Sequence, residues 1–301
     1  MITSAGWAES SAEGFGLRAG TALSLVQYGY LNMSEAIITE TLARLRGLHG
    51  PDLERIRIER AVAGIVFSGV KLSDGHGGMA GTPRPDSHPS PEDRQKPPPG
   101  ALNGVPVLSL LEPFPQDPFR RSLAVAALNA LSVPWMESGR HRIVYDRDAL
   151  DMTDIRPGMS VTIVGAFHSY IDRLKSVEGL SLRVLELRKS AMREEDMPFY
   201  ASPEKAQDII PESDALIITG LAVANMTLEG LLRLAQPKAS VVVVGPSGSM
   251  LPDALFRRNV SVVGGSIITD PDAALELLSQ GAYARHLYGR CARRINLLKN
   301  D

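Results

Sequence analysis

Two glycine-rich stretches carry the residue types best suited to binding a metal or an anion. In residues 74–78, a carboxylate and an imidazole, Asp74 and His76, stand two positions apart. Both side chains are common metal ligands, although a lone loop histidine is more often a surface residue. In residues 245–249, glycines allow close approach and serines offer hydroxyls, as in anion-binding turns, but the lysine of a P-loop is missing. The candidate metal ligands are therefore Asp74 and His76, and the candidate ligand-binding residues here are Gly245, Pro246 and Ser247.

A second group of residues matches part of a dinucleotide-binding pattern. Gly165 and Glu186 stand where such folds place the first phosphate-binding glycine and the ribose-binding acid. The other glycines of the pattern are missing. Phe167 and Tyr170 stand in their places, and their side chains would keep a pyrophosphate away from the backbone. Gly165 could equally do no more than make a turn. His168, at the start of a predicted helix, is a candidate ligand or acid–base group.

Three polar residues follow a further apolar run. Thr219 ends that run, and Thr227 is a natural N-cap for a helix beginning at residue 228, with Asn225 two positions earlier. These side chains either shape the turn or face a ligand. We therefore add Thr219, Asn225 and Thr227 to the candidate ligand-binding residues.

The elements that would position these groups form a regular pattern in the second half of the chain. Short apolar, β-branched runs alternate with helical stretches, which predicts a doubly wound parallel sheet covered on both faces. In such a sheet the loops at the carboxyl ends of the strands converge into a ligand crevice. The predicted strands are 161–164, 182–185, 215–218, 241–244 and 260–263, and the predicted helices are 168–176, 227–235, 252–257 and 272–278.

The first half of the chain has a different pattern. It predicts helices at 34–48 and 117–131, strands at 63–70 and 105–111, an exposed proline-rich loop at 83–100, and a connection at 133–155. The length of 301 residues is typical of two domains. We therefore expect an α/β protein with one domain at 1–150 and a Rossmann-like domain at 151–301.

Composition excludes several classes of protein. The chain is 44% hydrophobic and 22% charged, and its net charge of -2 gives no overall attraction to nucleic acid. Cys291 is the one cysteine, so neither an internal disulfide nor a CxxC metal site can form. No apolar run approaches the roughly 20 residues that span a membrane. Residues 1–15 lack the pattern of a secretory signal. We expect a cytoplasmic protein with neither membrane nor nucleic-acid partners.

Several ordered segments together resemble one family over most of the chain. They are residues 126–132, 157–158 with 163–165, 213–215 with 218–220, 225–229 and 244–247. Their order and spacing resemble the bacterial and archaeal proteins of the putative heavy-metal chelation family. The resemblance implies a Rossmann-like C-terminal domain after a smaller α+β domain similar to the N-terminal domain of enolases. It also implies a site between the two domains that includes Asn129, and a divalent or heavy-metal ion as ligand.

This sequence departs from the family pattern at two places. The proline-rich loop at 83–100 looks like an insertion, and His168 stands where the family usually has a non-ionisable residue. If His168 faces the cleft, it is a feature of this chain rather than of the family.

Three functions remain open. The first is a small-molecule or metal-chelate binding protein, with Asp74 and His76 facing the crevice loops across a cleft between the domains. The second is an enzyme with a nucleotide-like cofactor, in which Gly165 and Glu186 take the phosphate and ribose positions and His168 is the acid or base. The third is a homo-oligomer subunit whose crevice is vestigial. The resemblance carries no established reaction.

Overall fold

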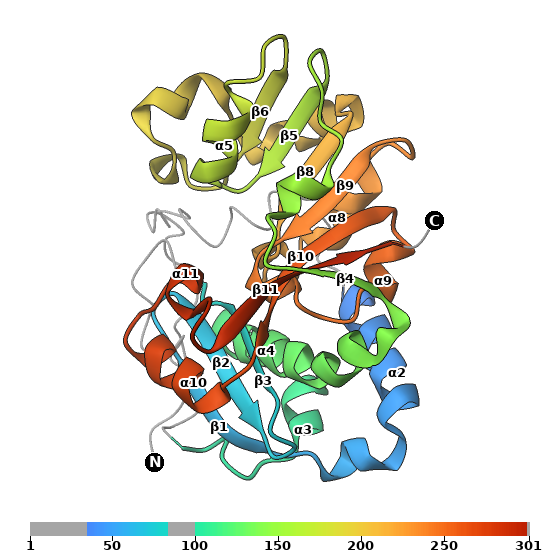
Figure 1. The fold of residues 1–301 in the computed structure, drawn as a ribbon, viewed down its shortest axis with the longest axis vertical. Coiled ribbons are helices and arrows are strands. Elements are labelled where there is room, and N and C mark those ends of the chain that lie inside the picture. The colour runs from blue at the N-terminus through green and yellow to red at the C-terminus, as the bar shows by residue number, and fades with distance from the viewer. Residues whose placement is uncertain (1–34, 84–99, 300–301) are drawn as a thin grey trace, which may run out of the picture.

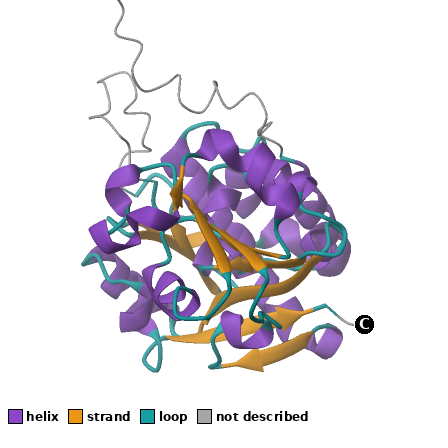
Figure 2. Ribbon diagram, turned by 90° about the horizontal axis from the view of Figure 1, so that it is seen from above, coloured by secondary structure: helices purple, strands orange, loops and turns teal. Residues whose placement is uncertain are grey.

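The computed structural model describes residues 35–83 and 100–299, which fold around one mixed sheet (Figure 1). Within these residues the sheet has eleven strands in the order β1-β2-β3-β10-β9-β8-β5-β6-β7, with β11 beside β10 and β4 beside β11. Helices lie on both sides of the strands (Figure 2), so the chain is an α/β protein. The strands are β1 (Ile58–Ala63), β2 (Phe67–Leu72), β3 (Gly77–Gly81), β4 (Arg142–Tyr145), β5 (Ser160–Val164), β6 (Ser181–Leu185), β7 (Tyr200–Ala201), β8 (Ala215–Thr219), β9 (Ser240–Val244), β10 (Val260–Ile268) and β11 (Ala292–Leu298).

All five strands predicted in the second half are confirmed, and they run parallel. The neighbouring pairs are β5 with β6, β5 with β8, β8 with β9, and β9 with β10. In β8, Leu216 and Ile218 face one apolar cluster, whereas Ala215 and Ile217 face the other. Both faces are covered, which is why these strands are apolar along their whole length. Their carboxyl ends share one edge of the sheet.

The four helices predicted between and after these strands are also present. They are α5 (His168–Leu174), α8 (Leu228–Leu234), α9 (Asp253–Phe256) and α10 (Pro271–Ser279). Asp270 caps α10, because its side chain accepts a hydrogen bond from the backbone N–H of Ala273 at 3.1 Å. This half also contains three further α-helices that are as short as α9, namely α6 (Ala206–Ile209), α7 (Leu221–Ala224) and α11 (Ala284–Leu287).

The first half contains an antiparallel hairpin pair, β1 to β3, packed against the long helix α4 (Pro118–Trp135), which in turn contacts the helix α2 (Ala36–His49). Both helices were predicted. Asp117 begins α4, since its carboxylate accepts a hydrogen bond from the backbone N–H of Arg120 at 2.7 Å and Pro118 fits the first turn. Residues 84–99, which make up most of the predicted proline-rich loop, are not among the described residues.

Two strand predictions for this half were wrong. The run 63–70 is not one strand, because β1 ends at Ala63 and β2 begins at Phe67 after a turn. Residues 105–111 contain the short helix α3 (Val107–Leu111) instead of a strand. The four buried residues of α3 follow a helical spacing that an apolar run of this length conceals. They are Val107, Leu108, Leu110 and Leu111.

Residues 133–155, predicted as a connection, contain a strand. After α4 the chain forms β4 and then the single-turn helix η3 (Ala149–Met152). β4 pairs antiparallel with β11, a strand that the sequence did not predict, and β11 also pairs antiparallel with β10. The C-terminal strand β11 thus lies between β10, which shortly precedes it in the chain, and β4, which comes from far upstream.

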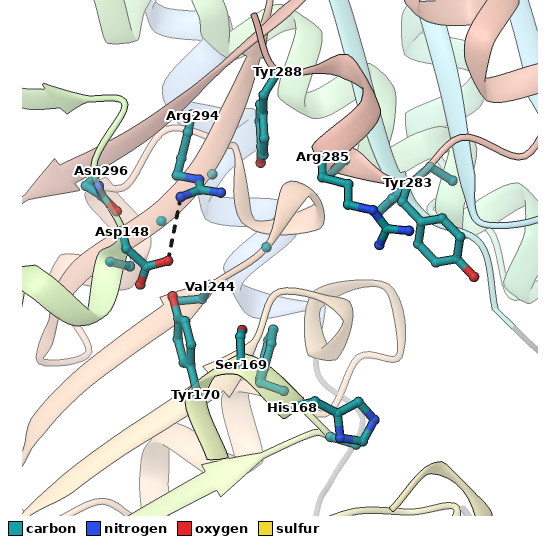
Figure 3. A pocket seen from close by; sticks show the side chains of 18 residues that line it. Asp148, His168, Ser169, Tyr170, Val244, Tyr283, Arg285, Tyr288, Arg294 and Asn296 are labelled. Carbon is teal, nitrogen blue, oxygen red and sulfur yellow. Dashed lines mark ion pairs between the residues drawn. The ribbon is translucent and has the colours of Figure 1, made fainter. Parts of the chain in front are cut away.

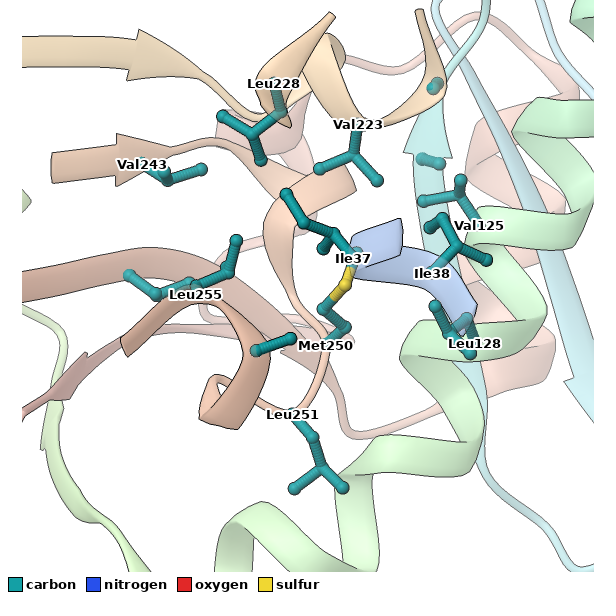
Figure 4. Close-up of a cluster of buried hydrophobic side chains, with 14 of the residues drawn as sticks. Ile37, Ile38, Val125, Leu128, Val223, Leu228, Val243, Met250, Leu251 and Leu255 are labelled. Carbon is teal, nitrogen blue, oxygen red and sulfur yellow. The ribbon is translucent and has the colours of Figure 1, made fainter. Parts of the chain in front are cut away.

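One apolar core joins the two halves of the chain (Figure 4). Ile37 and Leu128 come from the N-terminal helices, and they share the cluster with Val223, Val243 and Met250 from the parallel-sheet half. Such a contact resembles the interior of a domain more than a polar interface between domains. The division into residues 1–150 and 151–301 stays a prediction. Among the described helices, none has the length and apolar character to cross a membrane.

Candidate functional site

A pocket of about 490 Å³ opens beside the carboxyl ends of β5 and β9 and the middle of β10 (Figure 3). Its other wall is the C-terminal segment, which contributes α11 and β11, and Phe67 of β2 joins the rim. The segment just before η3 adds Asp148. The lining residues are Phe67, Asp148, Ala149, Ala166, Phe167, His168, Ser169, Tyr170, Val244, Gly245, Gly264, Gly265, Tyr283, Ala284, Arg285, Tyr288, Arg294 and Asn296.

Glycines keep one wall of the pocket free of side chains. A Cβ at Gly264 would lie 2.9 Å from the Cβ of Ala149 and 3.1 Å from Oδ1 of Asn296, and one at Gly265 would lie 2.6 Å from Oγ of Ser249. A side chain at Gly264 would collide with η3 and with Asn296 beside the pocket, and one at Gly265 would collide with Ser249 on the opposite face of β10. The two glycines therefore let β10 pack closely against its neighbours at this wall of the pocket.

Two arginines supply positive charge to the pocket. The guanidinium of Arg294 lies 3.6 Å from a carboxylate oxygen of Asp148 and 5.0 Å above the ring of Tyr288. Asp148 is also 3.4 Å from Arg173, so its single negative charge is shared between two cations. Arg285 stacks on the ring of Tyr283 at 4.7 Å, and among the described residues it forms no ion pair. The pocket thus retains positive charge for an anionic ligand.

Neutral polar groups complete the pocket. Asn296 is fully buried, and its Nδ2 donates to the backbone oxygen of Arg147 at 3.0 Å, while its Oδ1 has no partner among the described residues. The hydroxyl of Tyr288 lies 2.9 Å from Oγ of Ser266. Burial, and next the charge of Asp148, raise the pKa of Tyr170, so its phenol stays protonated. An acceptor and two phenols therefore accompany the two cations.

Of the residues predicted for the crevice, His168 and Gly245 line this pocket. Gly165, at φ 105°, lies just behind the lining residue Ala166, and a Cβ there would be 3.2 Å from Thr219. The structure thus brings these three predicted loops together at one edge of the sheet. Thr219 itself accepts a hydrogen bond from the backbone N–H of Leu221 at 3.3 Å.

Glu186 belongs to the same edge but is engaged with the backbone. One carboxylate oxygen accepts a hydrogen bond from the N–H of Ala166 at 2.9 Å, and the other accepts one from the N–H of Arg188 at 2.8 Å. The carboxylate thereby joins the turn after β5 to the turn after β6. It holds the loop that leads into the pocket.

Asn129, Pro246 and Ser247 connect the two halves of the chain behind the pocket. Nδ2 of Asn129 donates to the backbone oxygens of Met79 and Pro246, at 2.9 and 3.0 Å. Oγ of Ser247 accepts a hydrogen bond from the backbone N–H of Gly81 at 2.8 Å. We call these three contacts the β3 clasp. They fix the turn that follows Gly245, and so shape the pocket without lining it.

Asn225 and Thr227 lie apart from the pocket. Asn225 ends α7 and Thr227 precedes α8, but the side chain of Thr227 makes no capping hydrogen bond. Neither residue is among those lining the pocket. Met226 between them has φ 59°, so this turn is tightly wound.

Asp74 and His76 pair with each other, at the opposite end of the β2–β3 hairpin from Phe67. Nδ1 of His76 lies 3.2 Å from Asp74, and this contact raises the pKa of His76 although burial acts against it. Burial alone would raise the pKa of Asp74, but His76 lowers it below its usual value. The pair does not line the pocket, so the structure does not bring it together with the crevice loops. Within residues 35–83 and 100–299, no three His, Cys, Asp or Glu side chains are grouped to hold a metal.

Sequence reasoning missed the residues that give the pocket its charge and several of its neutral polar groups. They are Asp148, Arg285, Tyr288, Arg294 and Asn296. The signal for Asn296 was an amide within the apolar run Ile295 to Leu298 of a strand, because a polar residue at such a position is buried. No comparable local pattern marks Arg285, because its position depends on where the C-terminal segment folds back.

The segments of this chain that match known protein families lie within residues 48–297, which is nearly the range that the structure describes. Two family models match, at residues 48–132 and 148–297, and both are described as putative heavy-metal chelation. An uncharacterised protein of Methanocaldococcus jannaschii is 27% identical over 159 residues, which are 53% of this chain and 59% of that protein. The match therefore spans less than two thirds of that relative.

Two solved structures have a similar fold, and both are proteins of unknown function. One, from Pyrococcus horikoshii, has a TM-score of 0.67 at 20% identity and covers 86% of this chain and 100% of its own. The other, from Desulfitobacterium hafniense, has a TM-score of 0.62 at 20% identity and covers 85% of this chain and 99% of its own. At such identity the likeness concerns the fold alone.

Proposed function

We propose that this chain, which belongs to the family described as putative heavy-metal chelation, binds an anionic small molecule in complex with a heavy metal. The site is the pocket between the strand-end loops and the C-terminal segment. The observation that carries this proposal is the pair of arginines, Arg285 and Arg294, that line this pocket (Figure 3).

The charge of the pocket matches the chemistry of chelators. Compounds that hold heavy metals tightly do so with carboxylate, phenolate or hydroxamate groups, and their complexes often keep a net negative charge. Guanidinium groups bind such anions through several parallel hydrogen bonds. A pocket of about 490 Å³ is in the range for a small ligand of this kind. In this proposal the metal enters as part of the ligand, and Asp74 and His76 are not required to hold it.

The nucleotide alternative is supported less well by the contacts. A ribose at Glu186 would have to replace two backbone hydrogen bonds, from Ala166 and Arg188, that hold the loops at the carboxyl ends of β5 and β6. Leaving buried donors without a partner costs about 1–3 kcal/mol each. Without a nucleotide, the role of Gly165 is to make the turn after β5 and to pack against Thr219.

A binding screen tests this proposal directly. The protein is mixed with Ni(II) or Fe(III) complexes of citrate, nitrilotriacetate and EDTA, with the free metals, and with nicotinamide nucleotides, and melting is recorded. A ligand at 100 times its dissociation constant adds about 2.7 kcal/mol to the stability of the folded state. We expect stabilisation by at least one anionic complex and none by nucleotides.

A matched pair of variants places the binding in the pocket. Arg294→Met removes a cation that lines the pocket, whereas Arg290→Met removes an exposed arginine nearby that does not line it. Losing a charge-assisted hydrogen bond costs about 1.5–3 kcal/mol, which weakens binding by about tenfold or more. The proposal fails if no anionic complex binds, or if both variants weaken binding equally. A cytoplasmic location and a homo-oligomer stay predictions.

A further inference from the structure

We propose that His168 binds the metal ion of the chelate through Nε2, and that Asp196 orients the imidazole by accepting a hydrogen bond from Nδ1. This inference rests on the proposed function, since it concerns the same pocket and the same ligand. It assigns to the protein one ligand to the metal, while the chelator supplies the others.

The geometry starts from a buried carboxylate. Asp196, in the single-turn helix η5 (Glu194–Phe199), is 0% exposed. Its Oδ1 accepts a hydrogen bond from Nζ of Lys175 at 3.0 Å, but its Oδ2 has no hydrogen-bond partner in the described structure. Two ionisable groups lie within 4.0 Å of Oδ2, namely Nδ1 of His168 at 3.7 Å and a guanidinium nitrogen of Arg193 at 4.0 Å. A buried acceptor without a donor costs about 1–3 kcal/mol, so a donor is expected at Oδ2.

Nδ1 of His168 is the complementary atom. It is also buried without a hydrogen-bond partner, and it faces Asp196. A shift of less than about 1 Å would bring the two atoms into normal hydrogen-bond range. That bond places the proton on Nδ1 and leaves the lone pair on Nε2.

The other edge of the imidazole is open at the pocket. The side chain of His168 is 35% exposed although Nδ1 is buried, so the exposed part is the edge that carries Nε2. His168 lies at the rim, across from Tyr283 and Arg285 of the C-terminal segment (Figure 3). A chelate whose anionic groups face the arginines would thus present its metal near this edge.

A histidine held in this way has the arrangement of a metal ligand. Imidazoles that bind metals usually donate their second ring N–H to a carboxylate, which fixes the tautomer and the ring orientation. Imidazole favours Zn, Cu, Ni and Fe over Mg and Ca. One histidine is sufficient when the chelator leaves at least one coordination position of the metal open.

The experiment compares two chelates that differ in this respect. Nitrilotriacetate leaves coordination positions of Ni(II) open, whereas EDTA occupies them all. Calorimetric titration of the untagged protein measures affinity for both complexes. The EDTA complex is the more negative, so the arginines alone would favour it. We expect the opposite order, with the nitrilotriacetate complex bound about tenfold more tightly.

Three variants test which residues cause the preference for the nitrilotriacetate complex. His168→Phe should abolish it while leaving the affinity for the EDTA complex unchanged. His286→Asn, which alters an exposed histidine of α11 and keeps a hydrogen-bond acceptor, should leave it intact. Asp196→Asn should weaken binding of the nitrilotriacetate complex by about tenfold, the usual effect of losing a partner of a metal-binding histidine, and so bring its affinity close to that of the EDTA complex.

A spectroscopic measurement separates ligation from a merely structural role. With Cu(II) in place of Ni(II), electron paramagnetic resonance should show coupling to a histidine nitrogen in the wild type and in His286→Asn, but not in His168→Phe. If both chelates bind equally to all variants, this inference is wrong and the proposed function stands. If neither chelate binds to the wild type, this inference is wrong, and the proposed function fails with it if none of the other anionic complexes of the screen binds either.

Discussion

The close approach of α4 to β3 gives the sharpest prediction. A Cβ on Gly78 would lie 2.0 Å from the backbone oxygen of Ala126 and 2.6 Å from the backbone nitrogen of Ala130, whereas real contacts stay above 3.0 Å. Gly78→Ala therefore forces α4 away from the sheet by about 1 Å. Overpacking costs about 1–3 kcal/mol where side chains can move. Here the obstacle is helix backbone, so we expect a loss of about 3 kcal/mol or more.

Chemical denaturation followed by circular dichroism measures this loss, and thermal melting should show a midpoint lower by about 6 °C or more. Gly47→Ala is the matched control, because Gly47 lies within α2 and a Cβ there meets nothing within 4 Å. That substitution should stabilise the protein by about 0.5–1 kcal/mol, the difference in helix propensity. If Gly78→Ala changes stability by less than about 0.5 kcal/mol, the helix does not touch the strand as described.

Three further substitutions probe contacts between distant parts of the chain. Asn129→Ala leaves two carbonyl oxygens of the β3 clasp without their side-chain donor, and urea unfolding should show a loss of about 2–4 kcal/mol; a loss below about 1 kcal/mol would contradict the clasp. Glu40→Gln should cost about 1 kcal/mol near neutral pH, because hydrogen bonds from Arg258 and Arg257 lower the pKa of Glu40 from 4.5 to about 2. This stability is present above pH 4.5 and is lost as the pH falls toward about 2, so wild type and variant should converge in acid, and a constant difference would refute it. His76→Gln should cost about 0.5 kcal/mol at about pH 5.5 and nothing at about pH 9, because the pKa of His76 is raised and its stabilising charge disappears as the pH rises through that value; an equal cost at both values would rule out the ion pair.

The parallel sheet could be predicted because local sequence determines it. Strands covered on both faces need unbroken apolar runs, and each such run in the second half became a strand, although β10 extends beyond the predicted 260–263 to Ile268. The wrong predictions concern short apolar runs of the first half. Residues 107–111 could bury their side chains as a strand or as a helix, and packing against α4 decides between them.

The candidate site was predictable only in part, for a related reason. Gly165, His168 and Gly245 follow predicted strands, so the topology alone places them at one edge of the sheet. Asp74 and His76 had suitable chemistry, but their distance from the pocket depends on which end of a hairpin faces it. The arginines of the pocket lie on elements whose placement is set by pairing across the whole chain, and no local pattern encodes such pairing.

The register of β11 determines the chemistry of the pocket. Arg294 and Asn296 are two residues apart, so they project from the same face of the strand. The neighbouring residues Arg293 and Ile295 belong to the other face, where Ile295 enters the apolar core. A slip by one residue would therefore turn Ile295 toward the ligand and bury a charged residue in the core. β11 resists such a slip because strands flank it on both sides, and because Asn296 pairs with Gly264, whose missing Cβ leaves room for the amide. The same pairing that fixes the fold at the C-terminal segment thus also fixes a buried acceptor and a cation in the pocket.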